Sequence, residues 1–194
     1  TPPLAVAVQP DGTAWSADLA GERLGRVATD GTFTEVSLGG AGGEPTGLAV
    51  SADGIAWFTR PAEGRVGRRG SDGIVREFVL PEASEPTGIA VARDGAAWVA
   101  ERRGNRLVRV SPDGEVTAWP LATPNAQPDA ISFAPDGTVW AALPNARRIA
   151  RVSPRGTLEE ISVDNAPSGI AVAPDGGVWF AAPTAKKLGR LEPE

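Results

Sequence analysis

The chain has 194 residues, a formal net charge of -5 at pH 7, and neither cysteine nor histidine. The acidic balance argues against sequence-independent binding to nucleic acid or to an anionic membrane surface, because both require a basic face. The missing residue types exclude disulfides, thiolate nucleophiles, Ser-His-Asp catalysis and histidine-metal sites. Carboxylate, lysine, arginine and backbone chemistry remain, and Mg²⁺ or Ca²⁺ are the metals that suit all-oxygen ligands.

The chain is built from a repeat that is aligned on tryptophan. A proline stands twelve residues before each of these tryptophans, Asp-Gly stands four and three residues before it, and an arginine stands eleven residues after it. Five copies at spacings of 39 to 42 residues indicate one structural unit used five times. The tryptophans are Trp15, Trp57, Trp98, Trp140 and Trp179.

In chain order, the units are expected at residues 3–38, 45–80, 86–121, 128–163 and 167–194. The clearest unit, the third, has four runs rich in valine, alanine and tryptophan over 88–92, 96–101, 106–111 and 115–121. Gly, Pro, Asp and Asn separate these runs, which predicts four short strands. The Asp-Gly pairs predict tight hairpins in which glycine takes a positive φ.

A four-stranded antiparallel unit of about 40 residues is typical of a β-propeller blade. The sequence therefore predicts an all-β, single-domain, five-bladed β-propeller over residues 1–194. The fifth unit stops before a fourth strand, so the last blade is expected to lack its outer strand. Either a five-blade ring closes with a three-stranded last blade, or the chain is a piece of a longer propeller, or a partner supplies the strand.

The unit PTGIAVxxDGxxWxxExxxNRLxRxxPDGxVTxWPL, as it stands in residues 86–121, resembles the repeat of the streptogramin B lyase (virginiamycin B lyase) family of β-propellers. The resemblance covers essentially the whole chain and implies the propeller scaffold. For the enzymes of that family it implies seven blades and a Mg²⁺-assisted elimination that linearises a cyclic depsipeptide antibiotic, with a histidine as general base. This chain departs from that pattern in having five units and no histidine.

Most residues of the repeat are interpreted as structural. One tryptophan per blade at a fixed strand position is what packing between blades requires. The arginine column is expected to lay its side chains between blades with each guanidinium near a tryptophan face, a carbonyl or a carboxylate. The aspartate of each Asp-Gly pair is expected to accept a hydrogen bond from its own turn.

Residues that could carry chemistry are predicted where the blades differ, at the end that carries the loops between second and third strands. A carboxylate base is sought at Glu101 or Glu85, and an oxygen-ligated Mg²⁺ or Ca²⁺ at Asp18, Glu101 and Asp129. A small-molecule ligand at the mouth of the channel is the expected partner, and an ordinary charged rim is the alternative. The candidate ligand-binding residues are Asp18, Glu44, Arg60, Arg102 and Asp129.

Two functions remain in view. The first is a lyase-like scaffold or binding module without the family's catalytic activity, either a fragment or an engineered derivative. The alternative is a carbon-oxygen lyase that opens a cyclic depsipeptide or a related ester with a carboxylate base. A protein-interaction scaffold on the same face is a third hypothesis. A monomer is expected, with a strand-sharing oligomer as the alternative. No membrane span is expected, and a soluble protein of the cytoplasm or a secreted one both fit the sequence.

Overall fold

The computed structural model describes residues 3–18, 22–39, 43–81 and 84–192. These residues form five antiparallel sheets, four of four strands and a last one of three. Each sheet is one repeat unit, and its strands lie side by side in chain order. The predicted all-β propeller architecture, its five blades and the missing outer strand of the fifth blade are confirmed.

The strands are as follows. Blade one contains β1 (Pro3–Val8), β2 (Ala14–Asp18), β3 (Arg23–Val27) and β4 (Phe33–Ser37). Blade two contains β5 (Leu48–Val50), β6 (Ala56–Arg60), β7 (Arg65–Arg69) and β8 (Val75–Val79). Blade three contains β9 (Pro86–Val91), β10 (Ala97–Glu101), β11 (Arg106–Val110) and β12 (Val116–Pro120). Blade four contains β13 (Ile131–Phe133), β14 (Val139–Leu143), β15 (Arg148–Val152) and β16 (Leu158–Ser162). Blade five contains β17 (Ile170–Val172), β18 (Val178–Ala182) and β19 (Lys187–Leu191).

Short helical turns follow the second strand in three blades, where the sequence predicted only loops. They are the 3-10 turns η1 (Pro61–Glu63), η2 (Pro144–Ala146) and η3 (Pro183–Ala185). Proline begins each turn because its fixed φ suits the first helical position and its missing N–H removes no bond. A residue in the left-handed region ends each turn. No helix in the described ranges is long and apolar enough to cross a membrane.

The hairpins form as predicted. Gly95 has φ of 81° and Gly137 has φ of 90°, a region that side chains with a Cβ adopt only under strain. The preceding aspartate accepts a hydrogen bond from the backbone two residues on, as in the 3.0 Å bond from Ala96 N to Asp94 Oδ1. The Asp-Gly pairs are therefore turn residues.

The tryptophan and arginine columns meet across the second and third strands. Trp140 pairs with Arg151 in the strand register, and the guanidinium carbon lies 5.9 Å from the ring centroid. Blades one, two and five repeat this cation–π contact. In blade three Trp98 instead stacks on Trp119 at 4.5 Å, and Arg109 donates to Asp94. The columns stabilise the blades in the way that the repeat predicts.

The core lies between the blades. In blades one to four the tryptophan face is covered by the first two strands of the next blade, as Trp57 is by Ile89, Ala97 and Val99. We call the tryptophan side of a blade its front face and the opposite side its back face. At each of the four interfaces between consecutive blades, the front face of one blade packs against the back face of the next.

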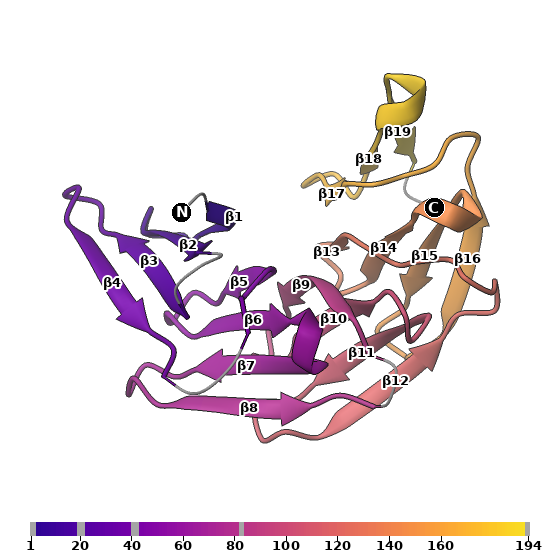
Figure 1. Cartoon of the computed structure of the whole chain (residues 1–194). Helices are drawn as coiled ribbons and strands as arrows, with labels where there is room; N and C mark the ends of the chain where they lie inside the picture. The colour runs from indigo at the N-terminus through magenta and orange to yellow at the C-terminus, as the bar shows by residue number, and fades with distance from the viewer. Residues whose placement is uncertain (1–2, 19–21, 40–42, 82–83, 193–194) are drawn as a thin grey trace.

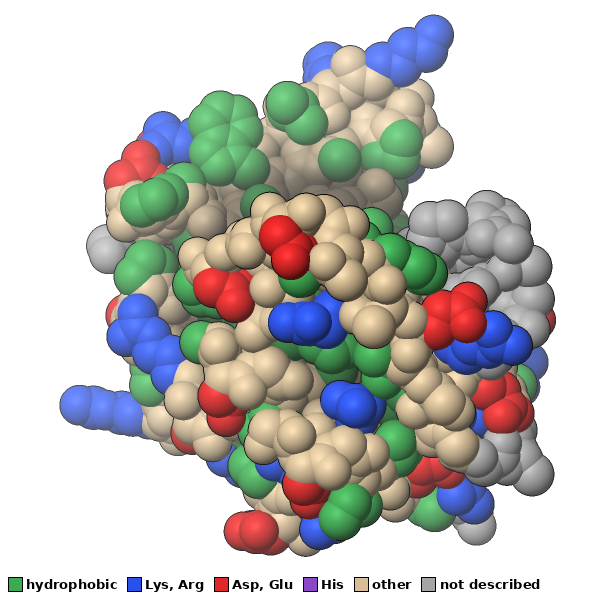
Figure 2. Space-filling view, turned by 90° about the vertical axis from the view of Figure 1, so that its left-hand side faces the viewer, with side chains coloured by type: hydrophobic (Ala, Val, Ile, Leu, Met, Phe, Trp, Pro, Cys, Tyr) green, Lys and Arg blue, Asp and Glu red, His purple; other side chains and the backbone are tan. Residues whose placement is uncertain are grey.

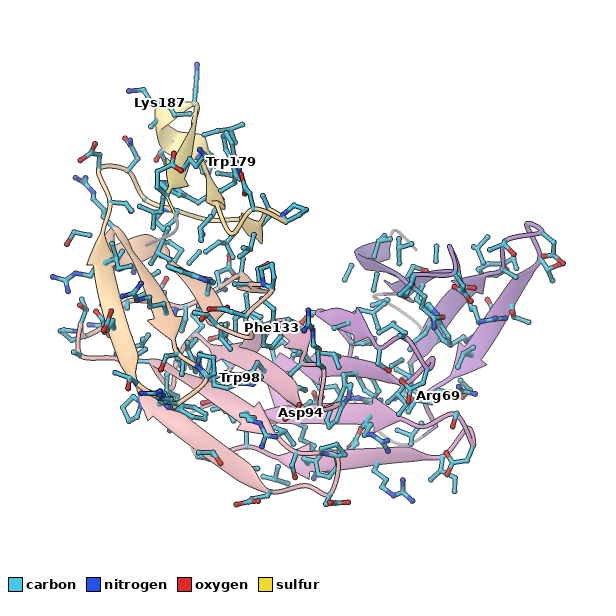
Figure 3. The ribbon with its side chains drawn as sticks, turned by 180° about the vertical axis from the view of Figure 1, so that it is seen from behind. Arg69, Asp94, Trp98, Phe133, Trp179 and Lys187 are labelled. Carbon is cyan, nitrogen blue, oxygen red and sulfur yellow. The ribbon has the colours of Figure 1, made fainter. Side chains whose placement is uncertain are left out.

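The five blades follow one another along an arc that is open between its ends (Figure 1). Inner strands of consecutive blades contact each other, and blade five stands across the open side from β1 (Figure 1). In the space-filling view blade five rises above the rest, with the basic residues at its tip (Figure 2). Trp98 lies within the arc and Trp179 lies on its last sheet (Figure 3). The five blades therefore do not close a ring by themselves.

Candidate functional site

Two ends of the blades can carry a site. We call the end with the loops between second and third strands and the connections between blades the loop face. The opposite end, with the Asp-Gly hairpins, is the hairpin face. The candidate residues predicted from the sequence all belong to segments of the loop face. Some of them are buried inside the blades, some form a cluster at the surface, and the others join neither group.

Glu101 ends β10 and is completely buried. Its Oε1 accepts a 2.8 Å hydrogen bond from Ser84 Oγ, and its Oε2 forms an ion pair with Arg106 Nε. Gly104 leaves room for this pair, because a Cβ there would lie 2.9 Å from Arg106 Nε. The carboxylate is held between a hydroxyl and a guanidinium inside the blade, so it has no open side toward a ligand.

Burial raises the pKa of Glu101 above its ordinary value of 4.5, and the Ser84 and Arg106 contacts offset only part of that rise. Between the ordinary and the raised pKa the folded state binds more protons than the unfolded state, so rising pH lowers the free energy of unfolding. The Glu101→Gln variant lacks this titration. Urea unfolding between about pH 4 and pH 7 should show wild type losing stability relative to the variant as pH rises, and a difference that stays constant or grows in favour of wild type would contradict the assignment.

Arg60 occupies the same column in blade two and is 2% exposed. Its Nε lies 3.1 Å from Glu77 Oε1, and its guanidinium lies 5.5 Å from the Phe58 ring centroid. The side chain therefore runs toward the outer strand β8, between blades. Leu143, in this column of blade four, is also fully buried. In blades two to five the residue three positions after the tryptophan is therefore buried and does not line an open mouth.

Glu85, Arg102 and Asp129 do come together on the loop face, and we call them the rim cluster. Arg102 Nη2 donates to Asp129 Oδ1 at 2.9 Å, and Arg102 Nη1 lies 3.8 Å from Glu85 Oε1. The exposed fractions of the three side chains are 38%, 38% and 31% for Arg102, Asp129 and Glu85. Arg103 adds a second guanidinium, with Nε 3.2 Å from Glu85 Oε2. The cluster thus joins blades three and four and remains open to solvent.

The rim cluster exists because blade three and blade four each depart from the repeat. Arg102 stands where blades two, four and five have the proline that begins a 3-10 turn, as at Pro61 and Pro144. Asp129 stands where blade three has Thr87, whose Oγ1 donates to the Ala100 carbonyl oxygen within its own blade. The two departures meet in one ion pair across the blade interface.

The other candidates do not join this cluster. The side chain of Asp18 lies outside the described part of the structure, although its backbone ends β2. Glu44 is exposed. Among the described residues no three carboxylates lie close enough to hold a metal ion together. Glu101 and Asp129, the other proposed ligands, are each paired with an arginine. The metal site predicted at Asp18, Glu101 and Asp129 includes a side chain outside the described residues, so it stays a prediction.

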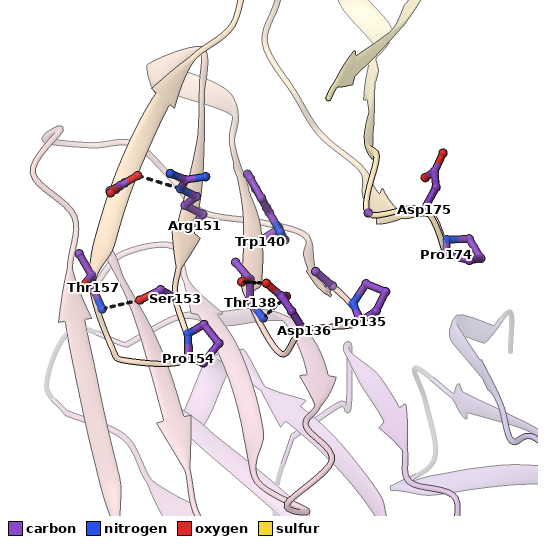
Figure 4. A pocket seen from close by; sticks show the side chains of 13 residues that line it. Pro135, Asp136, Thr138, Trp140, Arg151, Ser153, Pro154, Thr157, Pro174 and Asp175 are labelled. Carbon is purple, nitrogen blue, oxygen red and sulfur yellow. Dashed lines mark hydrogen bonds and ion pairs between the residues drawn. The ribbon is translucent and has the colours of Figure 1, made fainter. Parts of the chain in front are cut away.

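A pocket that the sequence did not predict lies on the hairpin face between blades four and five (Figure 4). Its volume is about 580 Å³, and Trp140, Arg151, Asp136 and Pro174 are among the residues that line it. Similar spaces lie between blades three and four and between blades one and two. These pockets follow the repeat, so they reflect the spreading of hairpins between neighbouring blades. Because the residues that line these pockets recur in most blades, the sequence alone does not distinguish one pocket from another.

Comparison with known proteins identifies the family. The family profile described as the Virginiamycin B lyase family matches residues 1–194. The chain belongs to the virginiamycin B lyase family. A search of curated protein sequences gives no match.

Solved lyases of this family share the arc of blades. A streptogramin B lyase is 32% identical, with a TM-score of 0.87 over 97% of this chain and 64% of its own. A catalytically inactive histidine-to-alanine variant of the virginiamycin B lyase from Staphylococcus aureus with quinupristin is 32% identical, with a TM-score of 0.86 over 99% of this chain and 66% of its own. The chain thus spans slightly less than two thirds of the length of these lyases. A gluconolactonase from Xanthomonas campestris shares only the fold, at 22% identity and a TM-score of 0.70.

Proposed function

We propose that this chain is a ligand-binding propeller of the virginiamycin B lyase family whose binding site is the rim cluster, and that it acts without histidine-based catalysis. The observation that supports this most is the meeting of two departures from the repeat in the Arg102–Asp129 ion pair. Residues that only build the fold recur in every blade, whereas these two do not. The absence of histidine removes the proton carrier that catalysis near neutral pH most often uses.

The chemistry of the rim cluster favours an amide-rich ligand. Arg102 presents N–H donors that suit carbonyl oxygens, and Glu85 and Asp129 present acceptors that suit amide N–H or ammonium groups. All three side chains are about one third exposed, and ion pairs in such positions contribute little free energy. A ligand can therefore replace these ion pairs with its own hydrogen bonds at a small free-energy cost. A cyclic depsipeptide contains both carbonyl oxygens and amide N–H groups. The S. aureus lyase variant solved with quinupristin supports that choice of ligand class.

Calorimetry with quinupristin tests the binding site. Arg102→Ala is expected to raise Kd at least about tenfold, because hydrogen bonds to a charged group contribute roughly 1.5–3 kcal/mol. The matched control is Arg155→Ala, since Arg155 is an exposed arginine on the hairpin between β15 and β16. The control should bind as wild type does. Equal affinity of wild type and Arg102→Ala would place the ligand elsewhere and reject the rim cluster.

A carbon-oxygen lyase is the second candidate, and membership of the lyase family favours it. Glu85 is the carboxylate that would serve as base, because it is partly exposed while Glu101 is buried. The base would take a proton from the carbon next to the C–O bond, and the bond would break to leave an alkene and a free carboxylate. No metal is assigned to this step, because the described residues do not assemble a set of ligands for one.

Liquid chromatography with tandem mass spectrometry separates the two candidates. Elimination opens quinupristin without a change in mass, whereas hydrolysis adds one water. The binding-module proposal predicts no new product with or without Mg²⁺. A linear isomer that disappears with Glu85→Gln would establish the lyase and overturn the binding module.

A further inference from the structure

The pocket between blades three and four, on the hairpin face, has aromatic walls. Its volume is about 420 Å³, and Trp98, Trp119 and Phe133 line it. The two tryptophans belong to blade three, and Phe133 ends the first strand of blade four. Trp98 and Phe133 are labelled in Figure 3. Small-molecule sites are commonly concave spaces of this size, with mainly apolar and aromatic walls and a few polar groups.

Two of the three aromatic residues depart from the repeat. The position of Phe133 holds valine in the other four blades, at Val8, Val50, Val91 and Val172. The position of Trp119 holds Val36, Phe78 and Ile161 in the other blades that have an outer strand. The sequence shows each departure, and the structure shows that both line one pocket. Because valine serves at the first position in the other four blades, the fold alone does not require Phe133.

Trp119 presents its ring in a fixed position. In the other blades an arginine guanidinium lies near the tryptophan ring, whereas in blade three Trp119 stacks on Trp98. The ring centroids of this pair are 4.5 Å apart, and the ring planes are 26° apart. Trp119 Nε1 also donates a 2.9 Å hydrogen bond to the carbonyl oxygen of Gly156 in blade four. The indole is thus held across the blade boundary with its hydrogen-bond donor already satisfied.

The charges around the pocket balance. The charged residues of its lining are Arg93, Asp94, Arg109 and Asp136. Arg109 Nη2 donates to Asp94 Oδ2 at 2.6 Å. Burial acts to raise the pKa of Asp94, but the hydrogen bonds that it accepts outweigh burial and hold this pKa below its ordinary value of 3.8. With two guanidinium groups and two carboxylates, the lining has no excess charge that would select an ion.

From these walls and this charge balance we propose that the pocket binds an uncharged, planar aromatic molecule of one or two fused rings, which packs against Trp119 and Phe133. Aromatic rings in offset-stacked or edge-to-face contact attract each other beyond the area that they bury. A cation would meet the guanidinium groups of the same lining, and an anion would meet its carboxylates. The proposal is independent of the rim cluster, which lies on the loop face.

Titration of ¹⁵N-labelled protein with unlabelled indole, followed by nuclear magnetic resonance, tests the pocket. The six tryptophan Nε1–H signals, assigned with single Trp→Phe variants, report on separate places in the fold. The Trp98 and Trp119 signals should shift together with one Kd, because a bound ring changes the magnetic field at both. Trp15, between blades one and two, should not shift. Shifts confined to Trp179, which lines a different pocket, or no shifts at all, would overturn the proposal.

Variants that restore the residue of another blade test the aromatic walls. Phe133→Val and Trp119→Val are each expected to raise the Kd of indole about tenfold, through loss of one ring contact. The matched control is Ile161→Val, which should bind as wild type does, because Ile161 holds the position of Trp119 in blade four and does not line this pocket. The amide signals of each variant check its fold, and if Trp119→Val does not fold, Phe133→Val decides alone.

Two further probes test the ligand class. Cyclohexylmethanol is apolar but not aromatic, and tetramethylammonium is a cation that aromatic rings attract. Both should bind more weakly than indole. A wild-type Kd for indole in Phe133→Val, an equal Kd for cyclohexylmethanol, or tighter binding of tetramethylammonium would each overturn the proposal.

Discussion

Replacing Trp57 by alanine is expected to lower the free energy of unfolding by about 3–5 kcal/mol. Trp57 is completely buried between blades two and three, and its ring centroid lies 5.7 Å from that of Phe78. Truncation removes this contact area and leaves a cavity that the rigid sheets on both sides cannot close. Urea unfolding followed by circular dichroism measures the loss.

The matched substitution is Trp179→Ala, at the same position in blade five. Nearly half of that side chain is already in water, so the same truncation should cost only about 1–2 kcal/mol. The comparison isolates the contribution of a neighbouring blade because residue type and strand position are the same. Equal losses at the two sites would mean that blade five is covered in solution.

Gly88→Ala is expected to destabilise the chain by about 1–3 kcal/mol. A Cβ at this position would overlap the carbonyl oxygen of Asp129 and lie 3.0 Å from its carbonyl carbon. Both atoms belong to the backbone of the next blade, so the inner strands would have to separate. This close approach is also what brings Asp129 within reach of Arg102, so the variant should weaken quinupristin binding as well.

Gly169→Ala is the control, because Gly169 holds the same position in blade five. A Cβ there meets only the Ala181 Cβ, at an ordinary 3.8 Å. Thermal unfolding should therefore place Gly169→Ala within about 0.5 kcal/mol of wild type. If both glycine variants unfold at the wild-type temperature, the packing of inner strands described for blades three and four is wrong.

Much of the fold could be predicted because the same residue types recur at the same positions in all five units. The Asp-Gly hairpins, the four strands of unit three and the tryptophan core all follow from columns in the sequence, and the predicted strands of that unit agree with the structure to within two residues. Whether the ring closes could not be predicted. The curvature of the arc depends on the angle at which the front face of one blade packs on the back face of the next. No pattern of residues in the sequence predicts that angle.

The candidate site was less predictable because side-chain direction at a strand end is a tertiary property. Glu101 and Arg60 stand next to the loop face in sequence, yet both side chains are buried. Arg102 is one residue further on and points to Asp129 of the next blade. One residue along a strand changes the face that a side chain occupies, so the column alone could not separate buried from open positions.

The family relationship and the chemistry of this chain lead to different expectations. The virginiamycin B lyase fold explains the scaffold, but a fold does not specify an activity. Arg102 and Arg103 distinguish blade three from its neighbours, and both lie at or beside the rim cluster. The proposed binding site therefore lies where the repeat is interrupted.

Hydrogen exchange with and without quinupristin tests that placement most directly. The rim cluster predicts ligand-dependent protection in residues 84–87, 101–104 and 128–130, with little change on the hairpin face. Protection confined to residues 135–138, 153–157 and 174–176 would put the ligand in the pocket between blades four and five. That result, or no protection at all, would contradict a binding site formed by Glu85, Arg102 and Asp129.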